Sequence, residues 1–305
     1  MSAIILGAGL SGLIAATQFP NSPVFEANGP EQLSHKAVLR FRSDALSCLT
    51  GIPFRKVTVR KSIYHDGQHV TPNIQLANLY SFKTNGGYLD RSIWNVEPVE
   101  RYIAPEDIQH QMAEMIGPRI KWNRPVDADR LASMPHPIIS TLPMPTLLQL
   151  MRDPDCEMGF KYSGIVVDRY RVKNADVFQT IYFPSPDFAT YRASITGNLL
   201  IVERSGAMAA DSIHDVLEAF GLGNMDVEVI EESHKQRFGK IAPIDDEWRR
   251  EKIFTLTRDH GIYSLGRFAV WRNVLLDDVV KDAAVVKRLI AGGNYSASLY
   301  HHQKG

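Results

Sequence analysis

Three glycines near the start of the chain have the spacing that binds the phosphates of a dinucleotide. The apolar residues 3–6 are typical of a strand buried on both faces, and the stretch Gly7-Ala8-Gly9-Leu10-Ser11-Gly12 follows at once. In such a loop Gly7 allows the tight turn, Gly9 lets the backbone approach a pyrophosphate, and Gly12 lets the next helix pack on the strand. The free N–H groups at the start of that helix would bind the phosphates.

An acidic residue stands where dinucleotide-binding folds contact the ribose. Residues 13–19 predict a helix, and residues 24–26 predict a second strand after it. Glu26 lies 19 residues after Gly7, at a distance where a carboxylate accepts hydrogen bonds from ribose hydroxyls. Its charge disfavours a 2′-phosphate, and hence NADP. We place the adjoining Ala27 in the same site; a glycine turn without a ligand is the alternative.

A second glycine motif lies near the end of the chain. Residues 260–267 predict a strand that stops at Gly266-Arg267, and residues 274–290 predict a helix with acids at its start and bases at its end. Arg267 can bind a pyrophosphate as a bidentate donor. The alternative is a surface arginine near a helix start.

The two motifs, with residues 139–143 between them, resemble the FAD-dependent amine oxidase superfamily, which includes protoporphyrinogen oxidases, monoamine oxidases and UDP-galactopyranose mutases. The likeness covers residues 1–42 and 255–292 best. It implies that the glycines bind the FAD pyrophosphate, that Glu26 binds the ribose, and that the last helix begins beside the flavin. Other cofactor contacts that we expect are Ala8, Leu10, Ser11, Ala27, Arg42, Val126, Gly266, Arg267, Asn273, Val274 and Leu275. No cysteine lies near the second motif, so we expect non-covalent FAD.

Residues 35–42 and 86–94 resemble small flavoproteins of bacteriophages that hypermodify thymine in their DNA. That likeness implies an FAD enzyme that oxidises a C–N unit in an amino-acid adduct of thymine, with a lyase-type outcome. The run from Lys36 to Lys61 holds seven Lys or Arg against one acid, Asp44. It would suit DNA phosphates, and a solvated face is the alternative. The Gly-Gly-Arg that commonly follows the acid in the superfamily is missing.

Arg192, Tyr88 and Tyr191 are the candidates for chemistry on the substrate. A flavin performs the redox step, so the protein must supply a dry pocket, often aromatic, and an anchor for the substrate. Residues 184–192 resemble a stretch of the mutase-like members, and an arginine there suits a substrate carboxylate. A structural ion pair is the alternative for Arg192, and core packing is the alternative for both tyrosines. No histidine spacing indicates a metal site.

The 305 residues suffice for two domains of an α/β protein. We expect a Rossmann-like FAD-binding domain of the glutathione-reductase type, made by residues 1–60, 100–150 and 253–305. A β-rich substrate domain of residues 61–99 and 151–252 would be inserted into it. Strands are expected at 57–64, 119–123, 136–141, 165–172, 177–183 and 198–203, a hairpin turn at Asp66-Gly67, and helices at 105–116 and 212–220.

Bulk composition adds few constraints. The formal net charge is zero, and two cysteines exclude a disulfide framework. No apolar run is long enough to cross a membrane, so we expect no membrane partner and a cytoplasmic location, in the host if the gene belongs to a phage. The oligomeric state is left open by the sequence.

Three functions fit these patterns. The first is an FAD-dependent oxidoreductase that acts on a free or nucleotide-linked amine or amino-acid-like group by hydride transfer, with DNA as one carrier of that group. The second is a flavoenzyme like UDP-galactopyranose mutase, which acts on a sugar nucleotide. The third is a nucleotide-binding module without catalysis.

Overall fold

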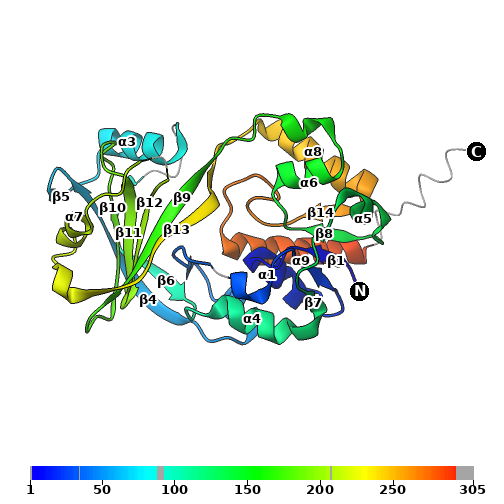
Figure 1. The fold of residues 1–305 in the computed structure, drawn as a ribbon, viewed down its shortest axis with the longest axis horizontal. Helices are drawn as coiled ribbons and strands as arrows, with labels where there is room; N and C mark the ends of the chain where they lie inside the picture. The colour runs from blue at the N-terminus through cyan, green and yellow to red at the C-terminus, as the bar shows by residue number, and fades with distance from the viewer. Residues whose placement is uncertain (1, 34, 88–92, 207, 293–305) are drawn as a thin grey trace, which may run out of the picture.

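The computed structural model describes residues 2–33, 35–87, 93–206 and 208–292, whose strands form two sheets side by side (Figure 1). The smaller sheet has five strands, all parallel, in the order β14-β8-β1-β2-β7. Their bounds are β1 Ile4–Leu6, β2 Val24–Phe25, β7 Ile120–Lys121, β8 Ile138–Ser140 and β14 Ile262–Ser264.

The strand order of the smaller sheet decides where its loops open. In order along the chain it reads 5-4-1-2-3, as in the first strands of a doubly wound sheet. The order reverses beside β1, where β2 lies on one side and β8 on the other. Gly7 and Thr141 follow the carboxyl ends of β1 and β8, and the Thr141 N–H donates to the Leu6 carbonyl at 3.0 Å. In open α/β sheets, ligands bind at such a reversal.

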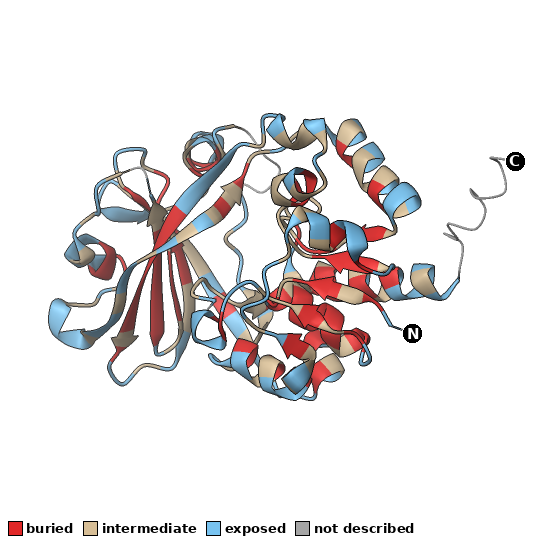
Figure 2. Ribbon diagram, turned by 45° about the vertical axis from the view of Figure 1, so that its right-hand side comes forward, coloured by how far each residue is buried: buried red, intermediate tan, exposed pale blue. Residues whose placement is uncertain are grey.

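Alternate residues of β1 serve two separate cores, which explains why this strand is apolar throughout. Ile5 packs with α1, α2, α4 and α9, whereas Leu6 packs with α5, α6 and α8 on the other face. Figure 2 shows that these strands and α1 are mostly buried. The helices span α1 Leu10–Gln18, α2 Ala45–Thr50, α4 Ile108–Ile116, α5 Ala128–Ser133, α6 Met144–Leu150, α8 Asp246–His260 and α9 Leu276–Ala291.

The larger sheet has nine strands in the order β13-β9-β12-β11-β10-β4-β6-β3, with β5 beside β4. Its pairs are antiparallel except β10 with β4. The helix α3, Ile74–Asn85, packs on one face and α7, Ile213–Glu218, on the other. The strands span β3 Arg40–Phe41, β4 Arg55–His65, β5 Gln68–Val70, β6 Val99–Ile103, β9 Tyr162–Val172, β10 Val177–Tyr182, β11 Thr190–Gly197, β12 Leu199–Ser205 and β13 Val227–Ile241.

Four short 3₁₀ turns complete the regular structure of the described residues, at Pro30–Gln32, Gly117–Arg119, Pro154–Glu157 and Asn224–Asp226. The fold is therefore mixed α/β with a parallel sheet and a second, larger sheet. Strands from both the 55–103 and the 162–241 regions build the larger sheet. The exact domain boundaries stay a prediction.

The elements that the sequence predicted are present, with shifted ends. The hairpin at Asp66-Gly67 is confirmed, because both residues have positive φ and β4 pairs with β5 across them. The helix predicted from Pro105 begins only at Ile108, so the proline is not its first residue. The strand predicted to stop at Gly266 ends at Ser264.

Close backbone packing fixes α1 on β1. A Cβ on Gly12 would lie 1.8 Å from the Gly7 carbonyl oxygen, whereas a Cβ on Gly9 would have nothing within 4 Å. Gly7 has a φ of +93°, and a Cβ there would meet the Thr141 hydroxyl at 2.6 Å. Gly7 and Gly12 therefore serve the turn and the close helix packing that their spacing predicts.

We expect Gly12→Ala to destabilise the protein by about 3 kcal/mol or more, because α1 must move off the loop. Gly9→Ala is the matched control. Gly9 has an ordinary extended φ of −64° and open space, so we expect a loss within about 1 kcal/mol, as for an N-cap change. Urea unfolding measures both values; equal losses would contradict this packing argument.

Candidate functional site

A cleft of about 970 Å³ lies between the two sheets and gathers most of the residues that the sequence singled out. Residues far apart in the chain meet there because both glycine motifs face the larger sheet. From the predicted cofactor and catalytic residues, the lining includes Gly9, Leu10, Ser11, Arg42, Tyr191, Arg192, Gly266, Arg267, Asn273, Val274 and Leu275.

The N-terminus of α1 forms one end of this cleft. Gly9 is its N-cap, and no side chain caps the first N–H groups of the helix. Gly9 lines the cleft, and the space where its Cβ would stand is open. Uncapped N–H groups at the start of a nine-residue helix carry a partial positive charge that favours an anion. The geometry fits a phosphate group at this point.

The second glycine motif lies directly against the first. Gly266 has a φ of +96°, and a Cβ there would come within 2.3 Å of the Ser11 hydroxyl oxygen. Only a glycine allows this approach without displacement of Ser11. Consequently Arg267, the next residue, reaches the same cleft as the N-terminus of α1.

The remaining predicted cofactor residues stand outside the lining of the cleft. The Glu26 carboxylate accepts hydrogen bonds from the Ala8 N–H at 2.7 Å and the Asn28 N–H at 3.0 Å. It therefore braces the glycine loop and keeps lone pairs for a further donor. Ala27 is exposed, and Val126 is half-buried against the core below the parallel sheet. Their cofactor contacts stay predictions.

The start of α9 carries its own carboxylates. Asp277, only 5% exposed, accepts from the backbone N–H groups of Arg42 and Ser43 at 3.0 Å. Asp278 caps the Leu275 N–H at 2.8 Å and pairs with the Arg42 guanidinium at 2.7 Å. These carboxylates offset the positive end of the helix dipole and join the start of α9 to the segment that follows β3. The expected place of this helix start beside a flavin stays a prediction.

A β-bulge sets the opposite wall of the cleft. The register between β11 and β12 shifts between Thr190 and Arg192, so the neighbouring Tyr191 and Arg192 both line the cleft. The Lys83 ammonium group of α3 holds the preceding turn, because it donates to the carbonyls of Phe183, Ser185 and Thr190 at 2.7–2.8 Å.

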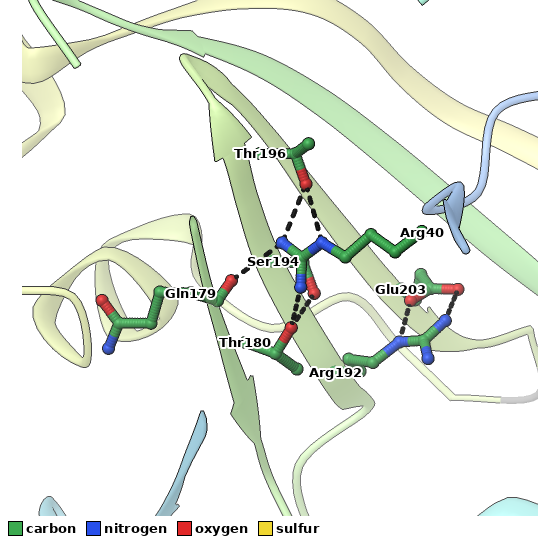
Figure 3. A network of polar contacts seen from close by, with 7 residues as sticks. All are labelled: Arg40, Gln179, Thr180, Arg192, Ser194, Thr196 and Glu203. Carbon is green, nitrogen blue, oxygen red and sulfur yellow. Dashed lines mark hydrogen bonds and ion pairs between the residues drawn. The ribbon is translucent and has the colours of Figure 1, made fainter. Parts of the chain in front are cut away.

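Arg192 is paired with a buried carboxylate. Its guanidinium makes a bidentate contact with Glu203 of β12, whose side chain is 2% exposed (Figure 3). Burial raises the pKa of the Glu203 carboxyl, but the charge and hydrogen bond of Arg192, together with the charges of Lys240 and His35, bring the net pKa below the usual value. An anchoring role of Arg192 for a substrate carboxylate would have to use its remaining N–H groups, and it stays a prediction.

Lys240 is a functional candidate that the sequence did not single out. It lies on β13, lines the cleft, and its ammonium nitrogen is 4.4 Å from the centre of the Tyr191 ring. Burial and the charge of Arg192, opposed by the charge of Glu203, lower the pKa of Lys240 to about 7. A lysine that exchanges its proton near neutrality can act as a base. The sequence alone did not reveal Lys240, because no recognisable motif surrounds this residue.

The Tyr191 hydroxyl is buried and has no hydrogen-bond partner in the described part of the chain. Burial raises its pKa far above the usual value, so the group stays a neutral donor. Tyr80 and Tyr182 line the same wall and contact each other edge to face. This wall is therefore aromatic, with one phenol free to donate to a ligand. Tyr88, the third catalytic candidate, lies outside the described residues.

Arg40 shows that the basic run of the sequence does not form one cationic surface. Its guanidinium lies against β10 and β11 and donates to Thr180, Thr196 and the Gln179 carbonyl (Figure 3). Other members pair with distant carboxylates, namely Lys36 with Glu231, Arg42 with Asp278, Arg55 with Asp176 and Lys56 with Glu100. Partners from distant elements neutralise a run that looks unpaired in the sequence.

No helix among the described residues is long and apolar enough to span a bilayer. No cluster of three or more His, Cys, Asp or Glu in the same part of the chain could hold a metal ion.

Solved structures share this fold. Reduced UDP-galactopyranose mutase matches with a TM-score of 0.69 and 15% identity, over 94% of this chain and 95% of that one. Putrescine oxidase bound to putrescine matches with a TM-score of 0.57 and 12% identity, over 95% and 99%. No protein-family model matches the chain, and no curated protein matches its sequence. At such low identity the likeness establishes the fold.

We expect Glu203→Gln to destabilise the protein by about 1–3 kcal/mol, because it leaves Arg192 without its counter-charge. Glu100→Gln breaks the exposed pair with Lys56 and serves as the control, for which we expect no measurable change. Urea unfolding at pH 7 compares the two. Equal stability of both variants would show that the Arg192–Glu203 pair does not hold β11 on β12.

Proposed function

We propose that the chain is an FAD-dependent oxidoreductase that acts on the C–N group of an amine or amino-acid-like substrate. The observation that carries this proposal is the pairing of two walls in one cleft. One wall has the uncapped N-terminus of α1 beside Gly266, and the other has Tyr191 beside Lys240. The shared fold with an amine oxidase and a flavin mutase supports it.

In this proposal the Rossmann-like part is the five-stranded sheet with its helices. Gly9, Leu10 and Ser11 would hold the FAD pyrophosphate, with Arg267 as a cationic partner. Glu26 would accept from the adenosine ribose. FAD would be bound without a covalent link, because no cysteine stands at the second motif and the two cysteines, Cys48 and Cys156, are far from it in sequence.

The other wall provides for the substrate. When bound, FAD supplies the acceptor for the hydride that leaves the carbon next to the amine. Neutral Lys240 would take the proton from the substrate ammonium group, which must be neutral before oxidation. The Tyr191 hydroxyl would donate a hydrogen bond to the substrate, and Tyr80 and Tyr182 would keep water from the reacting carbon.

A mutase-like reaction on a sugar nucleotide is the second candidate, and the higher TM-score of the mutase favours it. Anaerobic mixing separates the two. We expect an amine or glycine-like compound to bleach the flavin absorbance at about 450 nm, and UDP-galactopyranose to leave this absorbance unchanged. A purified protein without any flavin spectrum would favour the non-catalytic nucleotide-binding module instead.

A more specific form of this proposal takes an amino-acid adduct of thymine in DNA as the substrate. The enzyme would then act in the cytoplasm of a phage-infected host. Its support is the sequence likeness at residues 35–42 and 86–94. The basic run adds little, because most of its members are paired. If neither a nucleoside-linked amine nor DNA carrying the adduct bleaches the flavin, this form of the proposal is wrong.

We expect Gly9→Val to weaken FAD binding by about ten-fold or more, since its side chain would fill the open space at the N-terminus of α1. Fluorescence titration of the flavin-free protein measures this affinity. Gly159→Val, at an exposed glycine with equally open surroundings, should bind FAD like the unaltered protein. Unchanged affinity in Gly9→Val would remove the glycine loop from the cofactor site.

The rate of flavin reduction at saturating amine should rise with pH through about 7 and then level off, because Lys240 accepts a proton only when it is neutral. We expect Lys240→Met to lose this step and to slow reduction by about 100-fold. Lys235→Met, at an exposed lysine of the same strand, is the control. Stopped-flow absorbance gives these rates; an identical pH profile in Lys240→Met would exclude the base role.

A further inference from the structure

Lys61 and Arg101 lie on the same face of the larger sheet, at the part formed by β4 and β6. In the antiparallel register Val57 is opposite Arg101 and Val59 is opposite Val99. Lys61 follows Val59 by two residues, so it shares that face, and both cations line the cleft. The sheet therefore presents two basic side chains to the site where the substrate would bind.

Neither cation has a carboxylate partner among the described residues. The contrast with the other end of β4 is clear, because Arg55 and Lys56 pair with Asp176 and Glu100 at 2.8 Å. Arg101 donates only to a backbone carbonyl, that of Glu100, at 2.6 Å. Two long cationic side chains on one face of the sheet, without carboxylate partners among the described residues, are a feature that an anion would stabilise.

Mutual repulsion is evident in the ionisation of these groups. Burial and the charge of Arg101 both lower the pKa of Lys61. Arg101 also contributes, with burial and Arg192, to the lowered pKa of Arg40, which is about 10. Arg101 thus lies within electrostatic range of both Lys61 and Arg40 in a partly desolvated cleft.

The charge of the whole cleft also favours an anionic ligand. Among the described residues, seven Lys or Arg line it against two carboxylates, the basic residues being Arg40, Arg42, Lys61, Arg101, Arg192, Lys240 and Arg267 and the acids Glu203 and Asp277. Each acid already has partners, Glu203 in Arg192 and Asp277 in the backbone N–H groups of Arg42 and Ser43. A diamine that carries two positive charges is repelled by this surface, whereas an anionic group is attracted.

The two cations stand apart from the proposed cofactor wall. That wall comes from the loops after β1 and β14 and from the start of α9, whereas Lys61 and Arg101 belong to strands of the larger sheet. We therefore assign the anion that Lys61 and Arg101 would bind to the substrate and not to the cofactor.

We propose that Lys61 and Arg101 form an anion subsite that binds a phosphate or carboxylate group of the substrate, and so select amines that carry such a group over diamines. This inference rests on the proposed amine oxidation in the same cleft. It gives the larger sheet the role of specificity, through two residues that touch neither the amine nor the hydride acceptor.

Calorimetric titration of the protein as purified tests the subsite with four probes of similar length. These are 2-aminoethyl phosphate, β-alanine, ethanolamine and putrescine. We expect at least one of the two anionic probes to bind about ten-fold or more tightly than ethanolamine and putrescine. The phosphate and carboxylate probes then identify which anion the subsite prefers. Equal or tighter binding of putrescine would overturn the proposal.

Variants localise the effect. Lys61→Met and Arg101→Met should each weaken the preferred anionic probe by about ten-fold and leave ethanolamine unchanged. Arg60→Met is the matched control, because Arg60 is the neighbouring residue, is exposed, and lies on the opposite face of β4. Unchanged anion affinity in both variants would contradict the subsite. Variants that lose bound flavin while their anion affinity stays unchanged would contradict it as well.

The cofactor content of each sample separates this inference from the proposed function. If the protein holds no flavin but still binds the anionic probe through Lys61 and Arg101, then the oxidoreductase proposal fails and the subsite stands. If amines reduce the flavin without any preference for an anionic group, the subsite fails and the oxidoreductase proposal stands.

Discussion

Backbone contact at the N-terminus of α1 is the constraint on which the cleft depends. Three segments meet there, namely the loop after β1, the helix α1 and the loop after β14. They can do so only because two contact residues are glycines: Gly12 lies against the Gly7 carbonyl, and Gly266 lies against Ser11. The first contact fixes α1 on the parallel sheet, and the second brings the loop after β14 to the same helix end. Asp277 then ties α9 to the segment that follows β3, so that the proposed cofactor wall is joined to the larger sheet.

Electrostatics defines the opposite wall. Glu203 is a buried carboxylate among several cations, and its bidentate contact with Arg192 holds two adjacent strands together. Two features of this wall belong together. Burial, together with the charge of Arg192, lowers the pKa of Lys240 to about 7, and the small number of acids in the cleft leaves Lys61 and Arg101 without carboxylate partners among the described residues. A cleft of this kind suits a substrate that carries an amine and an acid.

The sequence predicted local features well and distant pairings poorly. The glycine loop and the hairpin at Asp66-Gly67 depend on backbone preferences of a few adjacent residues, so their patterns are readable. The basic run was misleading because its counter-charges come from other parts of the chain, such as Asp176, which lies 121 residues after Arg55. Lys240 had no signal at all, since only the pairing of β13 with β9 brings it beside Tyr191.

The central claim is that the two-walled cleft holds FAD. Mass spectrometry of the small molecules that the purified protein releases on denaturation tests it most directly. The account predicts FAD, close to one per chain and released without a covalent link. Release of NAD or FMN, or a protein that carries no nucleotide and fails to take up added FAD, would contradict it.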